Sequence, residues 1–287
     1  MSRFYSPLRY PGGKNRIFPF VKELLNENHI FSGTYIEPYA GGSGLALRLL
    51  LEDHVNTVQI NDFDFSIYAF WTAITEDPTG FCDWISDLSV SIDTWQHYKR
   101  VQTIHEEHDL VEIAKSTFFL NRTNISGIIK GGPIGGKDQS GKYKIDARFN
   151  KDDLIQRIID ISRVSDRISI TNFDALEFIR STTAVAENSF LYLDPPYYQK
   201  GSALYMNFYG DNDHASLAHE MSKLRGHWMV SYDLHNTITK LYPQHRKFSY
   251  KISQSTSNRV GNEILIFSDD LLYDIAIDHL NSPLAII

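Results

Sequence analysis

A buried strand that stops at two prolines is the feature that most constrains the fold of this chain. Residues 190–193 are apolar or aromatic, which is typical of a buried strand, and Asp194, Pro195, Pro196 and Tyr197 follow directly. Proline has no N–H to donate to a neighbouring strand, so a central strand cannot continue through this pair. A carboxylate and a rigid aromatic turn therefore stand at the carboxyl end of the strand.

Strand-like and helical patterns alternate on both sides of this strand, which favours a largely parallel α/β sheet. Short apolar runs predict further strands at 34–38, 57–62, about 167–171, 228–233, 248–253 and 264–267, with helices at 45–53, 175–180 and about 213–225. From residue 65 to 123 apolar residues recur at helical spacing, and a glycine-rich basic stretch follows at 126–146. The sequence predicts an α/β domain of residues 1–72 and 155–287, interrupted by a mostly helical insertion at 73–154.

The composition is that of an ordinary globular chain with an uneven distribution of charge. The 287 residues include one cysteine and carry a formal net charge of -7, and no apolar run is long enough to span a membrane. We expect a cytoplasmic protein with no membrane association. Two stretches, 115–151 and 240–259, are nonetheless rich in lysine and arginine. They indicate a local anionic partner, although solvated surface lysines explain them equally well.

A glycine-rich turn between a predicted strand and helix suggests a cofactor site. The segment IEPYAGGSG at 36–44 places Glu37 before the turn, and the next strand ends at Asp62, where doubly wound folds hold a ribose hydroxyl. The turn lacks the complete dinucleotide fingerprint, so it predicts a nucleoside cofactor without a pyrophosphate. A tight turn with only a structural role is the alternative.

Two other motifs are incomplete. GGPIGGKD at 131–138 resembles a phosphate-binding loop, but it lacks the following Ser or Thr and the flanking strand and helix. The two histidines of HEEHD at 105–109 are three residues apart, which does not match the zinc-protease pattern. We expect no metal site.

The residues from Asp194 to Tyr197 suit one difficult reaction, attack by the exocyclic amino group of a nucleobase. The lone pair of that nitrogen is delocalised into the ring, and hydrogen bonds to the Asp194 carboxylate and the Pro195 carbonyl would localise it. The Pro195–Pro196 pair would keep both acceptors rigid, and Tyr197 would stack on the base. A base inside a duplex is out of reach, so it would have to be flipped out. The alternative is a turn in which Asp194 only caps the strand.

Five segments together resemble the Dam-type class of DNA N6-adenine methyltransferases, in which the cofactor segment precedes the catalytic segment. These are RYPGGK (9–14), IEPYAGGSG (36–44), INDFD (60–64), FFLNRTNISGI (118–128) and NEILI (262–266), in addition to DPPY. The resemblance implies a Rossmann-like S-adenosylmethionine-dependent methyltransferase fold, with the helical insertion as the domain that recognises the DNA target.

The resemblance also implies roles for individual residues. It assigns S-adenosylmethionine binding to Tyr10, Lys14, Glu37, Pro38, Gly41, Gly44, Asp62, Asp174 and Asp194. We expect DNA contacts from Arg122, Asn124, Lys130, Lys137, Lys142, Lys144 and Arg259.

The hypothesis from sequence is a site-specific methyltransferase that modifies N6 of a flipped adenine in double-stranded DNA. A cognate restriction endonuclease is a candidate partner. One alternative is an RNA adenine methyltransferase. A second is a nucleic-acid-binding relative without activity, and a third, more distant, is a nucleotide hydrolase built on residues 131–138. The intact set Tyr10, Lys14, Glu37, Asp62 and Asp194 favours an active enzyme over the second alternative.

Overall fold

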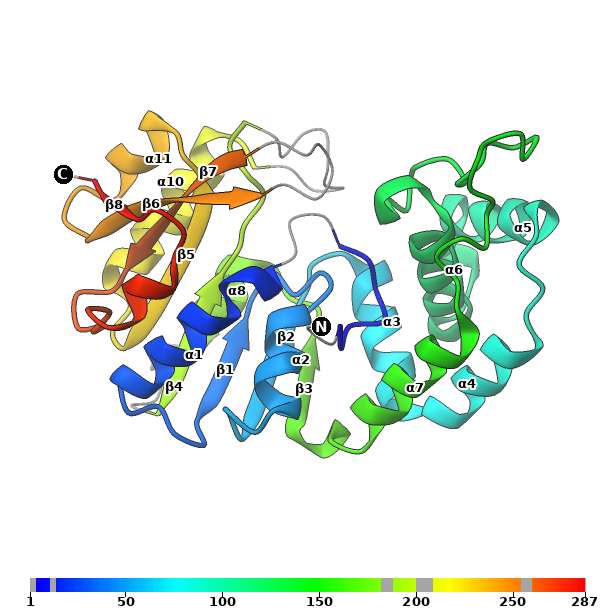
Figure 1. Cartoon of the computed structure of the whole chain (residues 1–287), viewed down its shortest axis with the longest axis horizontal. Helices are drawn as coiled ribbons and strands as arrows, with labels where there is room; N and C mark the ends of the chain where they lie inside the picture. Colours follow the sequence, from blue (N-terminus) through cyan, green and yellow to red (C-terminus); the bar gives the residue numbers. More distant parts are fainter. Residues whose placement is uncertain (1–3, 11–13, 182–187, 200–208, 254–259, 287) are drawn as a thin grey trace. The chain divides into compact units, whose positions relative to one another are not determined.

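The computed structural model describes residues 4–10, 14–181, 188–199, 209–253 and 260–286 (Figure 1). The chain divides into two compact units. One consists of Met1–Gly13 and Phe65–Asp166, the other of Lys14–Asp64 and Arg167–Ile287. The helical insertion predicted at 73–154 lies within the first of these, which we call the helical unit. The second is called the sheet unit.

The sheet unit is built on a mostly parallel sheet. Its strands are β1 (Thr34–Glu37), β2 (Thr57–Asn61), β3 (Ile168–Thr171), β4 (Ser189–Leu193), β5 (His227–Asp233), β6 (Lys247–Ser253), β7 (Val260–Phe267) and β8 (Leu284–Ala285), and their order in space is β3-β2-β1-β4-β5-β7-β6-β8. The strands from β3 to β5 in this order are parallel. β7 lies antiparallel between β5 and β6, and β8 pairs antiparallel with β6.

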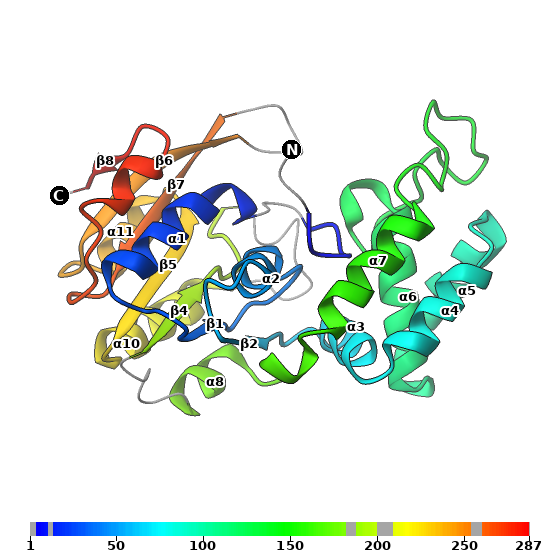
Figure 2. The same cartoon turned by 60° about the horizontal axis from the view of Figure 1, so that its bottom comes forward.

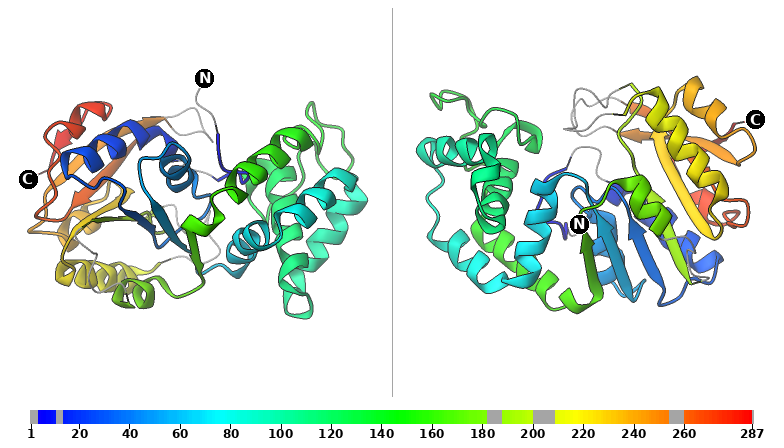
Figure 3. Two further views of the ribbon diagram at one scale, coloured as in Figure 1. Left: turned by 90° about the horizontal axis from the view of Figure 1, so that it is seen from below. Right: turned by 180° about the vertical axis from the view of Figure 1, so that it is seen from behind.

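Helices cover both faces of this sheet, which explains the continuous apolar run of β4. The short 3-10 helix η1 (Lys14–Ile17) leads into α1 (Phe18–Glu27), which with α2 (Gly44–Leu51) covers one face, while α8 (Ala175–Ser181), α10 (Asp211–Lys223) and α11 (Asn236–Leu241) cover the other (Figure 3). All five residues of β4 are buried. A strand covered on both faces has no solvent side, so it needs no alternating polar residues.

The order of the strands determines where a ligand can bind. Strands β1, β2 and β3 follow one another toward one edge of the sheet. Strands β4 and β5 follow one another toward the opposite edge. In such sheets the crevice at the carboxyl ends of the strands, at the point where the order reverses, is the usual binding site. Here that point lies between β1 and β4.

The helical unit contains α3 (Phe65–Glu76), α4 (Pro78–Asp87), α5 (Ile92–Thr103), α6 (Leu110–Thr123) and α7 (Lys151–Ser162), together with the single-turn 3-10 helices η2 (His105–Glu107) and η3 (Ile125–Gly127). Figure 2 shows α4 to α7 gathered in one bundle. Aromatic residues fill its core: Phe118 on α6 stacks on Phe70 with ring centroids 5.7 Å apart, and its edge contacts include Phe81 and Phe149. Side-chain caps begin four of the helices, at Asp77, Ser91, Asp109 and Asn150.

The glycine-rich stretch after α6 has little regular structure, as its composition predicts. Its described residues contain the turn η3 and an isolated bridge between Asn124 and Pro133, and the rest are turns and bends. Neither a strand before nor a helix after residues 131–138 is present, so the phosphate-loop alternative has no structural support.

The α/β fold class with a mostly parallel sheet is confirmed. Every predicted strand is present to within a few residues. The prediction contained no helix at α1, α7 or α11, no strand at β8, and no antiparallel pairing for β6 and β7. No helix among the described residues is both long and apolar enough to cross a bilayer.

Replacing Phe118 with alanine should destabilise the helical unit by about 3–5 kcal/mol, because a fully buried ring would leave a cavity among four aromatic neighbours. Urea unfolding followed by tryptophan fluorescence measures the loss. Val111→Ala, at an exposed position of the same helix, is the matched control and should change the unfolding free energy little. Equal effects of the two substitutions would contradict this account of the core.

Candidate active site

Three carboxylates meet at the predicted edge of the sheet. Glu37 is the last residue of β1, Asp62 follows β2 directly, and Asp194 follows β4 directly. Because β1, β2 and β4 are parallel neighbours, their carboxyl ends lie at one edge. The strand order therefore brings together acids that are far apart in sequence.

Asp194 presents one bonded oxygen and one without a partner. Its Oδ1 accepts a 2.8 Å hydrogen bond from Ser231 Oγ and lies 3.1 Å from Lys14 Nζ. Its Oδ2 has no hydrogen bond from any described residue, and the side chain is 24% exposed. Burial raises the pKa of Asp194, although the charge of Lys14 opposes this rise. The carboxylate is thus fixed through one oxygen, and the other is available to accept a hydrogen bond.

The turn after Asp194 is held from β5. Asp233, the last residue of β5, accepts 2.9 Å hydrogen bonds from the backbone N–H groups of Tyr198 and Gln199. Pro195 and Pro196 are buried, and proline fixes one backbone dihedral in each. The carbonyl of Pro195 accepts no backbone hydrogen bond from the described residues. Two rigid acceptors, Asp194 Oδ2 and the Pro195 carbonyl, therefore follow one another at this edge.

The Tyr197 hydroxyl is anchored in a buried cluster. It donates a 2.6 Å hydrogen bond to Glu263 on β7, and Lys14 Nζ donates to the same hydroxyl. Lys14 Nζ also lies 5.0 Å from the centre of the Tyr197 ring. These contacts fix the orientation of a ring that the sequence analysis assigns to base stacking.

The glycine turn after β1 has the backbone that a close ligand approach requires. Gly41 has a φ of +46°, and its N–H donates a 2.7 Å hydrogen bond to Asp62 Oδ2. A Cβ at Gly44, the first residue of α2, would lie 3.1 Å from the Asn15 side chain. No side chain caps α2, so its N-terminal N–H groups have no side-chain acceptor in the described part of the chain.

Glu37 is buried with one unsatisfied oxygen. Its Oε1 accepts a 2.9 Å hydrogen bond from Tyr35, whereas Oε2 is buried without a hydrogen-bond partner among the described residues. Burial raises the pKa of Glu37 to about 8, which the hydrogen bond from Tyr35 opposes and the charge of Asp194 reinforces. An orphaned buried acceptor of this kind fits a cationic or hydrogen-bond-donating ligand.

Asp62 stands at a sheet edge where two phenylalanines are exposed. Burial, reinforced by the charge of Asp64, raises the pKa of Asp62 to about 7. Phe63 and Phe173, at the ends of β2 and β3, are 56% and 46% exposed. Asn172 ties these ends together by donating to the carbonyls of Asp62 and Phe63. The sequence analysis missed both rings, although exposed aromatic residues beside a strand-end acid are a recognisable feature of a base-binding site.

Two of the residues predicted to bind the cofactor, Asp174 and Tyr10, do not belong to the group of strand-end acids. Asp174 caps the start of α8, and its Oδ1 accepts from the N–H groups of Leu176 and Glu177 at 2.9 and 3.3 Å. Tyr10 belongs to the helical unit and is partly exposed. A cofactor contact by either residue stays a prediction, as does the contact of Pro38, which follows Glu37 in the turn.

Two of the predicted DNA-binding residues hold the helical unit together. Arg122 is 8% exposed and donates from Nε and Nη2 to the carbonyl of Arg148. Asn124 is fully buried, donates to the carbonyls of Ile128 and Ile129, and accepts from Trp95. The described contacts of both side chains are structural.

The predicted lysines differ from these two residues in being exposed. Lys130, Lys137, Lys142 and Lys144 all lie on the glycine-rich stretch with their side chains at the surface. In the second basic stretch, by contrast, Lys247 is buried and Arg246 donates to three backbone carbonyls. Arg259 lies outside the described residues.

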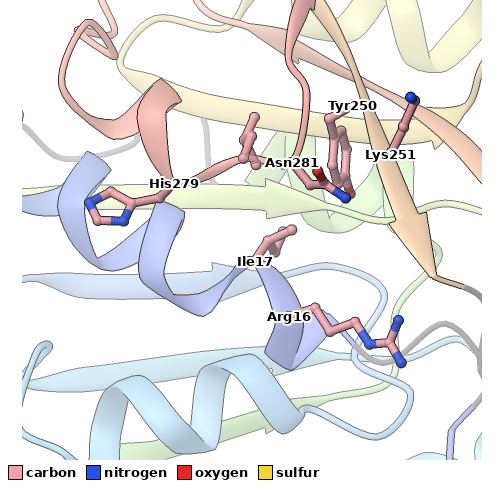
Figure 4. Close-up of a pocket in the computed structure, with 7 residues that line it drawn as sticks. Arg16, Ile17, Tyr250, Lys251, His279 and Asn281 are labelled. Atoms are coloured by element: carbon pink, nitrogen blue, oxygen red, sulfur yellow. The ribbon is translucent and has the colours of Figure 1, made fainter.

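A cavity of about 150 Å³ opens elsewhere in the sheet unit, between η1, β6 and the segment after the 3-10 helix η5 (Ala276–His279). Figure 4 shows Arg16, Lys251 and His279 around it with the ends of their side chains pointing in different directions. None of the predicted site residues lines this cavity. Groups of three or more potential metal ligands are absent from the described residues.

Comparison with known proteins identifies the family. A model of the D12 class N6 adenine-specific DNA methyltransferases matches residues 10–260. The chain belongs to this family. It is therefore an adenine-specific DNA methyltransferase, and the RNA-directed and nucleotide-hydrolysing alternatives are not supported.

Two curated relatives are similar over much of their length. The type II methyltransferase M.MjaIII of Methanocaldococcus jannaschii is 25% identical over 205 residues, which cover 66% of this chain and 68% of that protein. The type II methyltransferase M.CviBI of Paramecium bursaria Chlorella virus NC1A is 23% identical over 265 residues, which cover 90% and 95%. The second match spans both compact units.

The raised pKa of Glu37 predicts a pH-dependent stability. The folded protein holds a proton on Glu37 up to a pH of about 8, whereas the unfolded chain loses it near the ordinary glutamate pKa of 4.5. This contribution to stability is complete below the unfolded pKa and is lost as the pH rises through the folded pKa. Glu37→Gln cannot ionise, so the melting temperature of the variant relative to wild type should rise between pH 5 and pH 8.5.

Thermal unfolding at several pH values measures this difference. Glu52→Gln, the same chemical change at the end of α2, is the matched control. A difference between Glu37→Gln and wild type that does not vary with pH would show that Glu37 does not titrate as the structure predicts.

Proposed function

We propose that this enzyme transfers the methyl group of S-adenosylmethionine to N6 of an adenine flipped out of double-stranded DNA. The observation that carries the proposal is the arrangement at Asp194, where Oδ1 is bonded and Oδ2 is available beside the rigid Pro195 carbonyl. These two acceptors match the two hydrogens of an exocyclic amino group. Accepting both would localise the nitrogen lone pair, and fixed acceptors do this without reorganising during the reaction.

Tyr197 would stack on the flipped base. The hydrogen bonds that hold its hydroxyl leave the ring in one orientation, so the loss of motion on base binding is small. A flipped base must exchange its stacking in the duplex for stacking in the protein.

The residues at the ends of β1 and β2 fit the cofactor. Glu37 would accept from its amino group through the unsatisfied Oε2, and the Gly41–Gly44 turn would let the chain approach closely. Asp62 would bind the ribose hydroxyls, and Phe63 or Phe173 would pack against the adenine ring. When bound, the cofactor supplies a methyl group on a sulfonium, which is a good leaving group without a metal.

The order of these residues supports the Dam-type arrangement. Glu37 and Asp62 precede the main segment of the helical unit, Phe65–Asp166, in the chain, and Asp194 follows it. We therefore place the cofactor segment first and the catalytic segment last, with the helical unit as the target-recognition domain between them.

DNA binding would depend on the exposed lysines of residues 130–144 rather than on the buried Arg122 and Asn124. A cationic stretch at the surface suits the phosphate backbone, whose contacts supply most of the affinity. The type II names of both relatives also suggest that a restriction endonuclease of the same specificity accompanies this enzyme.

Asp194→Asn should reduce methyl transfer at least about 100-fold, because one acceptor atom becomes a donor at the reacting nitrogen. Incorporation of labelled methyl groups into unmethylated duplex DNA measures the loss, and single-molecule sequencing locates the modified base. Asp211→Asn, at the exposed start of α10, is the control. Activity of Asp194→Asn within a few-fold of wild type would refute the proposed role.

Replacing Lys130, Lys137, Lys142 and Lys144 together with glutamine should weaken DNA binding and flatten its salt dependence. Each lost phosphate contact lowers the slope of log K against log salt by about 0.9. Fluorescence anisotropy with a labelled duplex at several salt concentrations gives the slope. Lys22, Arg180, Lys223 and Arg225 of the sheet unit lie outside both basic stretches, and changed together to glutamine they form a control of equal charge. An unchanged slope in the variant that lacks the four lysines of residues 130–144 would show that DNA binds another part of the protein.

A further inference from the structure

Glu263 is a buried carboxylate that receives three hydrogen-bond donors. It is 4% exposed, and its Oε1 accepts a 2.6 Å bond from Tyr197. Its Oε2 accepts from Tyr250 at 2.6 Å and from Lys14 Nζ at 3.1 Å. The donors come from three separate segments of the sheet unit: the turn after β4, strand β6 and the helix η1. One side chain on β7 thus joins all three.

The register of the sheet places Glu263 beside the reactive turn. In the antiparallel pairs, Glu263 lies opposite Asp233 on β5 and opposite Tyr250 on β6. Asp233 holds the backbone of the turn that follows Asp194, and Glu263 holds the hydroxyl of Tyr197 in the same turn. Figure 1 shows β5, β7 and β6 side by side. The paired residues Asp233 on β5 and Glu263 on β7 therefore hold the turn after β4 at two points, its backbone and the Tyr197 hydroxyl.

The charge of Glu263 also acts on Asp194. Lys14 Nζ lies 3.1 Å from an oxygen of each carboxylate, so one ammonium is shared between two carboxylates. Burial opposes ionisation of Glu263, but Lys14 and the two tyrosines outweigh burial and lower its pKa. The negative charge of Glu263 in turn raises the pKa of Asp194. Without it, Lys14 would be left to pair with Asp194 alone.

We propose that Glu263 is a positioning residue for methyl transfer, which shares Lys14 with Asp194 so that Asp194 stays a strong acceptor for the adenine amino group. The proposal rests on the function proposed above for Asp194. Glu263 touches neither substrate nor cofactor in this account. It acts by holding Tyr197 and by preventing a one-to-one ion pair between Lys14 and Asp194.

The other described titratable groups around Asp194 do not obscure the effect of the Glu263 charge on the pKa of Asp194. Besides Lys14 and Glu263, the titratable groups around Asp194 are Glu37, Tyr35, Tyr192, Tyr197 and Tyr250. Burial raises the pKa of each of these tyrosines well above the ordinary value, so they stay neutral. Glu37 titrates near pH 8 in the free protein, and a substitution at Glu263 leaves it in place. A difference between wild type and a Glu263 variant therefore reports on Glu263.

Steady-state kinetics of E263Q provide the first test. In this variant the Tyr197 hydroxyl loses a charged acceptor, and Lys14 forms an ion pair with Asp194 alone. We therefore expect kcat to fall about 10- to 100-fold. KM for the donor and for DNA should stay within about threefold of wild type, since Glu263 touches neither. The acid limb of the kcat profile should move to lower pH, because loss of the nearby negative charge lowers the pKa of Asp194.

Three further variants separate positioning from a general structural role. E263D keeps the charge and should restore the acid limb to its wild-type position. Tyr250→Phe removes one donor but keeps the charge of Glu263 and the shared lysine, so the acid limb of its kcat profile should move less than that of E263Q. E220Q, the same chemical change on the surface helix α10, is the matched control. A fall in kcat without movement of the acid limb, or an E263D profile equal to that of E263Q, would overturn the proposal.

A titration without substrate keeps this test independent of the proposed function. The ¹³C carboxyl resonance of Asp194, assigned by its loss in Asp194→Asn, should titrate at lower pH in E263Q than in wild type. An unchanged titration would overturn the role of Glu263 even if the enzyme methylates adenine. Absence of transfer in wild type, or full activity of Asp194→Asn, would instead refute the proposed function, while the titration still decides on Glu263.

Discussion

Lys14 lies between Asp194 and Glu263, and the reactive edge of the sheet depends on this shared charge. Removing charged groups from water costs several kcal/mol per ion unless partners and hydrogen bonds compensate. Here one ammonium serves two carboxylates, and Ser231, Tyr197 and Tyr250 supply the remaining hydrogen bonds. The cluster joins η1, the turn after β4 and strands β5 to β7, so the position of each depends on the others. A carboxylate in such a cluster can be both buried and reactive.

The parts of the fold that follow from local chemistry could be predicted from the sequence. The apolar run of β4 and the prolines after it define where a central strand ends, and parallel pairing then carries its acid to the same edge as Glu37 and Asp62. The glycine-rich stretch after α6 was predicted without regular structure because its residues favour turns. The end of β4 and the irregular stretch after α6 are each determined by residues within about ten positions of them.

Features that depend on long-range register could not be predicted in the same way. The sequence places Glu263 in the segment NEILI and Asp233 at the end of a predicted strand, but only the antiparallel pairing of β7 with β5 sets the two residues opposite one another. DNA contacts were predicted for Arg122 and Asn124 because both lie in the segment 118–128, which resembles part of the family's target-recognition domain. Their burial follows from the packing of α6 against the loop that ends near Arg148, which no local pattern specifies.

The insertion of β7 between β5 and β6 also has a consequence for biosynthesis. Lys14 and Glu263 are 249 positions apart, so the ion pair that completes the site joins the beginning of the chain to one of its last strands. During synthesis the nascent polypeptide would carry the Asp194 turn long before the strand that holds Tyr197 emerges from the ribosome. Closing such a long loop is slow compared with forming local contacts. The site would therefore be completed only after translation of β7.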